Sequence, residues 1–138
     1  MHLKMTVGKI MQSLNAFKGS KPICDIEGLL IVRGVCRDEN FEKYNSIKEY
    51  LEAKLKENGF EIADEDDIVL FVERINNVLK ETMASPDMFG FEALKKSFES
   101  IGCECDYVIG KKGNLMVGVS MWFDKNRKNP KFVEVVGC

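Results

Sequence analysis

The stretch Leu115-Met-Val-Gly-Val-Ser-Met-Trp-Phe123 decides the fold, because it alternates like a β-strand and carries no charge on either face. One face is apolar throughout: Leu115, Val117, Val119, Met121 and Phe123. The other face carries Met116, Gly118, Ser120 and Trp122. Two interpretations of this second face stay open. It is either covered, as in a central strand, or it forms the floor of a binding groove in which Gly118 permits close approach and Trp122 gives contact area.

The neighbouring segments predict strands that pair with this one. Residues 103–109 alternate with a period of two, and a further strand is expected over 131–136. Turn residues at 110–114 and 124–130 connect the three, which predicts an antiparallel meander. Nearer the N-terminus, the apolar run from Ile23 to Cys36 contains Glu27-Gly28 as a plausible turn and predicts a β-hairpin.

Helical spacing marks four further segments. Thr6 is a candidate N-cap for a stripe from Val7 to Phe17 that ends at Lys18-Gly19. Ser46 and Glu49 form a capping box for a helix that Asn58-Gly59 ends. A central helix follows the acids at 64–67 and runs to Met83, and Asp87 can cap another that ends before Gly102. Between the second and the central helix, the segment 60–62 is either an edge strand or a linker.

These elements predict a single α+β domain over residues 1–138. An N-terminal helix and a β-hairpin precede central helices, which pack on one face of a mostly antiparallel sheet completed by the C-terminal three-strand meander. A chain of 138 residues that is 45% hydrophobic is large enough for one core. The expected core residues are Phe71, Ile75, Phe91, Leu94, Phe98, Val117 and Val119.

The residue content argues against most catalytic chemistry. His2 is the only histidine, so the chain cannot build a Ser-His-Asp or Cys-His site. No phosphate-binding loop or dinucleotide fingerprint is present either, and we therefore favour a protein that is not an enzyme. The first residues lack a signal-peptide pattern and no apolar run is long enough for a membrane span, so we expect a cytoplasmic protein that does not contact membranes.

The five cysteines are expected to be free thiols. An odd number suits a reducing compartment better than a disulfide framework. Cys24, Cys36, Cys103 and Cys105 could in principle bind zinc, but a C-x-C strand pair and two cysteines twelve positions apart do not match the usual knuckle spacing. We therefore expect neither a metal nor a cofactor.

Charge is unevenly distributed along the chain. Residues 1–22 carry four lysines and no acid, whereas residues 23–105 carry 19 acidic and 10 basic groups. The acids around 61–67 are expected to be the solvated start of a helix, or alternatively a docking surface for a basic partner.

The basic residues near the C-terminus form two groups. Lys111 and Lys112 are expected at one hairpin tip, and Lys125, Arg127, Lys128 and Lys131 surround the next connection. They are either ordinary solubilising charges or a site for the phosphates of a nucleotide or nucleic acid.

The leading functional hypothesis is a small cytoplasmic binding protein of the inhibitor, immunity or phage-encoded accessory kind, which binds a protein partner or a small ligand. Its predicted site combines the second strand face with charge at the rim: Met116, Ser120, Trp122, Lys125, Arg127 and Lys128. The alternative is a nucleotide or nucleic-acid binder that uses Lys111, Lys112 and Lys131. The sequence predicts no oligomeric state.

Overall fold

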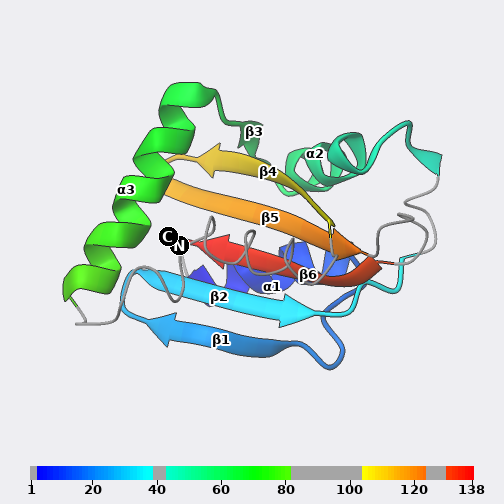
Figure 1. Cartoon of the computed structure of the whole chain (residues 1–138), viewed down its shortest axis with the longest axis horizontal. Helices are drawn as coiled ribbons and strands as arrows, with labels where there is room; N and C mark the ends of the chain where they lie inside the picture. The colour runs from blue at the N-terminus through cyan, green and yellow to red at the C-terminus, as the bar shows by residue number, and fades with distance from the viewer. Residues whose placement is uncertain (1–2, 39–42, 82–103, 124–129) are drawn as a thin grey trace.

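The computed structural model describes residues 3–38, 43–81, 104–123 and 130–138. Within these ranges the chain forms an α+β fold with a six-stranded sheet in the order β1-β2-β6-β5-β4-β3, in which every neighbouring pair is antiparallel (Figure 1). The elements are α1 (Leu3–Ser13), β1 (Lys21–Ile26), β2 (Leu29–Gly34), α2 (Ile47–Glu57), β3 (Glu61–Ile62), α3 (Glu65–Glu81), β4 (Glu104–Lys112), β5 (Leu115–Phe123) and β6 (Pro130–Gly137).

The predicted hairpin and meander are both confirmed. Ile26 pairs with Leu29 across the turn Glu27-Gly28, and Gly28 has a φ of 86°. Lys112 pairs with Leu115, so β4 continues to Lys112 and the turn is shorter than the sequence suggested. A two-residue turn needs positive φ, which Gly113 supplies at 60°. The two predicted tip lysines therefore lie in a strand.

Helices cover both faces of the sheet, whereas the sequence pattern predicted one covered face. Helices α1 and α2 pack on one face, where Val117 and Val119 of β5 lie in the larger core cluster. On the other face, Phe71 and Ile75 of α3 join a second cluster. The reason is visible in β5, whose two faces are both apolar and both need cover.

The core prediction holds where it can be compared. Phe71, Ile75, Val117 and Val119 are all buried. The other three predicted core residues are Phe91, Leu94 and Phe98. They lie outside the described residues, as does the helix expected after Asp87.

Helix α1 differs from its prediction at both ends. It already includes Leu3, so Thr6 is an interior residue and not the N-cap. The helix ends at Ser13, because Asn15 adopts a left-handed conformation with a φ of 51°. Phe17 therefore lies beyond the helix, and it is 53% exposed.

Both ends of α2 and the start of α3 agree with the sequence signals, and the predicted end of the central helix at Met83 lies outside the described residues. The backbone N–H of Glu49 donates to Ser46 Oγ at 3.1 Å, which is the predicted cap of α2. The acidic cluster begins α3, where Asp67 N–H donates to Asp64 Oδ1 at 2.9 Å. The undecided segment is an edge strand, since Glu61 pairs with Lys111.

Candidate functional site

The predicted strand-face site is buried. Met116, Ser120 and Trp122 are 2%, 1% and 0% exposed. Trp122 Nε1 donates to Ser120 Oγ at 3.1 Å, so the indole N–H has a partner inside the protein. The covered-strand interpretation therefore describes this face. The expected rim residues Lys125, Arg127 and Lys128 lie outside the described residues.

An ion pair that the sequence analysis missed lies on the same buried face. Glu134 of β6 pairs directly with Ser120 of β5 and with Arg33 of β2. Its Oε2 accepts from Arg33 Nε at 3.2 Å and from Arg33 Nη2 at 2.9 Å. Its Oε1 is buried and has no hydrogen-bond partner among the residues that the structure describes. Burial raises the pKa of Glu134, and Arg33 acts in the opposite direction.

The two predicted phosphate-binding lysines point to different elements. Lys111 Nζ forms an ion pair with Asp67 Oδ2 at 2.9 Å, and this contact lowers the pKa of Asp67. Lys112 Nζ donates to the backbone oxygen of Asn58 at 3.3 Å. Adjacent residues of a strand face opposite sides, so the pair does not form one site. Lys131 belongs to β6, and its side chain is not among those described.

Lys112 instead borders a cavity, which we call the lysine cavity. Its volume is about 440 Å³, and it lies between α1, the C-terminal end of α2 and the end of β4. Its walls are formed by Met5, Thr6, Lys9, Glu57, Asn58 and Lys112. The Lys112 ammonium group lies 5.8 Å from the centre of the Phe60 ring, and this contact helps to hold the side chain at the cavity wall.

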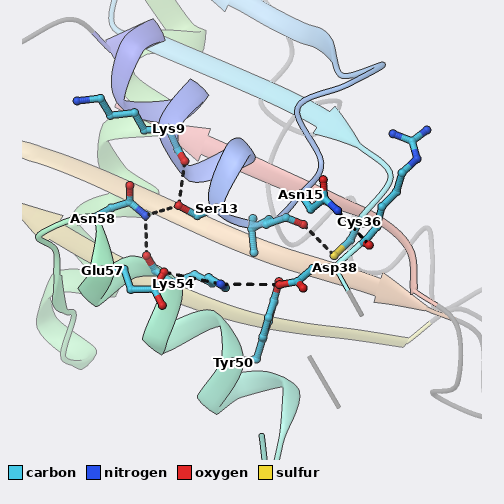
Figure 2. A network of polar contacts seen from close by, with 11 residues as sticks. Lys9, Ser13, Asn15, Cys36, Asp38, Tyr50, Lys54, Glu57 and Asn58 are labelled. Carbon is cyan, nitrogen blue, oxygen red and sulfur yellow. Dashed lines mark hydrogen bonds and ion pairs between the residues drawn. The ribbon is translucent and has the colours of Figure 1, made fainter. Parts of the chain in front are cut away.

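A polar network fixes the two helices that form the cavity (Figure 2). Asn58 Nδ2 donates to Ser13 Oγ at 3.0 Å and to the Lys54 backbone oxygen at 2.7 Å. Ser13 Oγ in turn donates to the Lys9 backbone oxygen at 3.0 Å. The network therefore ties the last turn of α2 to α1 and sets the distance across the cavity.

The inner part of this network contains titratable groups that are held in a structural role. Tyr50 Oη donates to Asp38 Oδ2 at 2.8 Å, and Lys54 Nζ lies 3.7 Å from the same oxygen. Cys36 Sγ donates to the Leu14 backbone oxygen at 3.2 Å. Burial raises the pKa of both Cys36 and Tyr50. A thiol with a raised pKa is a poor nucleophile near neutral pH. The hydrogen bonds of Cys36 and Asp38 instead hold the segment after β2 against the end of α1 and against α2.

The electrostatics of the lysine cavity favour an anion. Lys9, Lys112 and Thr6 are among the residues that line it, and the two lysines carry positive charge. Glu57, the one carboxylate among the described lining residues, lies 3.7 Å from Lys54 Nζ, which offsets part of its charge. Ammonium and hydroxyl groups are the donors that phosphate and carboxylate oxygens accept from. Sequence reasoning found Lys112 but missed Lys9, since no local pattern links two lysines about one hundred positions apart.

The cysteines show no metal site in the part of the chain that can be compared. Cys24, Cys36 and Cys138 are free thiols, and burial raises the pKa of Cys138 to about 11. Across residues 3–38, 43–81, 104–123 and 130–138, no three potential metal ligands come together. Cys103 and the Cys105 side chain lie outside this comparison.

The fold and the cavity define a small α+β protein with room for a small molecule between two helices. The chain belongs to a family described as an uncharacterized protein conserved in archaea (DUF2120), whose profile matches residues 5–137. It is 62% identical over 135 residues to an uncharacterized protein of Methanocaldococcus jannaschii, in an alignment that covers 97% of this chain and 81% of that protein. No solved structure matches the chain. Among its described helices, none is both long and apolar enough to cross a membrane.

Proposed function

We propose that the chain is a small, non-enzymatic binding protein that holds a small ligand with an oxyanion group in the lysine cavity. The observation that carries the proposal is the meeting of Lys9 and Lys112 at one cavity of about 440 Å³. Ligand cavities in proteins are typically about 300–1,000 Å³. Charged donors at the wall would orient the anionic end, and the Met5 side chain offers apolar contact to the remainder.

This proposal develops one branch of the sequence-based hypothesis. A small ligand was one of the two expected partners, and a nucleotide is one member of the phosphate-bearing class that the cavity suits. We further propose that the protein acts in the cytoplasm. An inhibitory, immunity or phage-encoded role stays a prediction, as does recognition of nucleic acid through residues 125–131.

Calorimetric titration of the full chain with inorganic phosphate, pyrophosphate and succinate tests the proposal. The variants Lys9→Met and Lys112→Met keep the aliphatic stem of each side chain and remove its charge. Each should weaken binding at least tenfold, which corresponds to about 1.4 kcal/mol. Lys18→Met is the matched control, because Lys18 is exposed and does not line the cavity.

Glu57→Gln gives a test with the opposite sign. Removing a carboxylate from the wall reduces repulsion of an anion, so this variant should bind the same probes more tightly. Weaker binding by Glu57→Gln would mean that the ligand presents a cationic group to Glu57. Failure of all three probes to bind the native chain would contradict an oxyanion site.

A further inference from the structure

We infer that the chain binds an extended peptide by strand addition at the outer edge of β4, and that this peptide alternates basic and apolar side chains. The site is a cavity of about 310 Å³ at the edge of the sheet, where β3 ends and α3 begins. The described residues that line it differ from those of the lysine cavity, so the inference does not rest on the proposed function.

The backbone ladder between β3 and β4 ends where this cavity begins. Strand β3 pairs with Gly110 and Lys111, at the C-terminal end of β4 (Figure 1). The last hydrogen bond runs from Ala63 N–H to the Ile109 oxygen at 2.8 Å, and the chain then enters α3. In an antiparallel strand a residue presents its N–H and C=O to the same side, so the Ile109 N–H also faces outward. Within the described part of the chain this N–H has no acceptor.

One side of the cavity is charged. Asp106 lies on the same side of β4 as Val108, which packs in the core cluster that includes α2. Lys48 and Glu52 of α2 complete the charged lining on this side. A side chain that enters from a strand beside β4 therefore meets polar groups here.

The other side of the cavity is mainly apolar. Tyr107 and Ile109 alternate with the residues above and pack in the second core cluster, together with Ala63 and Ile68. A ligand that fits both sides must present charged and apolar groups in alternation. The side chains of a β-strand do so with a period of two, and peptides that add to a sheet edge are recognised in this way.

The charges of the lining favour basic side chains in the peptide. Glu52 and Asp106 are half-buried, whereas Lys48 is exposed. A carboxylate that is partly removed from water attracts a cation more strongly than an exposed ammonium group repels one, because the effective dielectric constant is lower. The exposed acids Glu61 and Asp64 lie next to lining residues in the sequence and extend the negative charge.

The two edges of the sheet differ in how they are protected. Strand β1, at the opposite edge, contains Pro22 and a register irregularity between Pro22 and Cys24, which are both devices that hinder strand addition. Strand β4 contains no proline and pairs with β5 in unbroken register from Glu104 to Lys112. Pairing of β4 with β4 of a second copy would bring acidic residues of both copies, Glu104 and Asp106, into one ladder. A separate basic peptide is therefore the better occupant.

Calorimetric titration with a designed peptide tests the inference. The probe is the acetylated, amidated peptide Thr-Val-Lys-Val-Lys-Val-Thr, whose valines would face the α3 side and whose lysines would face the α2 side. The native chain should bind it about tenfold more tightly than the grouped sequence Thr-Val-Val-Val-Lys-Lys-Thr. Binding should also slow the hydrogen exchange of the Ile109 amide.

N-methylation of the peptide separates strand pairing from side-chain contact alone. The peptide residues that share a face with Ile109 present their N–H groups to β4, so these residues are the valines. Methylation of the valine nitrogens should weaken binding about tenfold, whereas methylation of the lysine nitrogens should change it little. Equal effects of the two modifications would overturn strand addition.

Charge variants of α2 test the basic character of the peptide. Glu52→Lys should bind the lysine peptide about tenfold more weakly and should gain affinity for Thr-Val-Glu-Val-Glu-Val-Thr. Glu49→Lys is the matched control, because it makes the same change at an exposed position of α2 that is not among the described lining residues. Equal losses in both variants would contradict a local site.

The remaining outcomes separate this site from other occupants and from the lysine cavity. Lys9→Met should bind the lysine peptide like the native chain, so the two proposals can fail independently. Protection of the Ile109 amide that rises with protein concentration without peptide would assign the edge to a second copy. That result, or no binding of the lysine peptide by a native chain that is folded by circular dichroism, would overturn the inference.

Discussion

Glu134 is a charged residue that is buried in the described interior. Its side chain is 1% exposed, and one carboxylate oxygen is paired with Arg33. The other oxygen has no hydrogen-bond partner within the described part of the chain. A buried carboxylate that loses its cation is strongly destabilising, although a complete buried pair adds little net stability. Arg33 therefore compensates the buried negative charge of Glu134. Removing Arg33 tests this role directly.

Arg33→Met should lower the free energy of unfolding by about 3 kcal/mol at neutral pH. The pKa of Glu134 is already above its ordinary value of 4.5, and loss of Arg33 raises it further. A raised carboxyl pKa gives stability that is full below the unfolded-state pKa and is lost as pH rises through the folded-state pKa. The variant should therefore approach native stability near pH 4. Urea unfolding at several pH values measures this, and a pH-independent loss would contradict it.

Trp122 was expected to contact a ligand, but its complete burial predicts a different result on truncation. Trp122→Ala removes a large side chain from a strand covered on both faces and should destabilise by about 3–5 kcal/mol. Trp122→Phe keeps most of the volume and should lose less. Thermal unfolding followed by circular dichroism compares the two. A Trp122→Ala variant as stable as the native chain would contradict the burial of Trp122.

The sequence predicted the type of every described helix and strand except the two-residue strand β3, because periodicity and caps are local signals and β3 is too short to show a period. Ser46 and Gly28 are examples in which one residue marks a boundary. Two features were not local. The layer covering each face of β5 depends on distant helices, and the lysine cavity depends on α1 and β4 meeting in space. Burial of both faces was one of two open interpretations, since alternation alone cannot say what covers a strand.

The contact between α3 and β5 is close enough to depend on a glycine. A Cβ atom on Gly118 would lie 3.0 Å from Phe71 Cε2, and Phe71 is buried and cannot easily retreat. Gly118→Ala should therefore destabilise by about 1–3 kcal/mol. Gly8→Ala is the comparison, since its Cβ would lie 3.8 Å from Phe17 and a helix interior favours alanine by about 0.5–1 kcal/mol. The midpoint of denaturant unfolding should therefore fall for Gly118→Ala and rise for Gly8→Ala.

The sheet as a whole joins distant parts of the chain. Strand β6 lies between β2 and β5, and Arg33 and Glu134 in its ladder are 101 positions apart. Non-local pairings slow folding because the loop must close before contacts form. Refolding followed by the fluorescence of Trp122, the single tryptophan, should therefore lag behind helix formation measured by circular dichroism. Coincident phases would contradict this.

The central place of β6 has a consequence for the newly synthesised chain. Until β6 is made, β2 and β5 each present an open hydrogen-bonding edge, and either can pair with a strand from another molecule. One strand closes both edges at once. Substitutions that weaken β6 should consequently appear first as a lower yield of soluble protein during expression, before any change in the properties of the molecules that do complete the sheet.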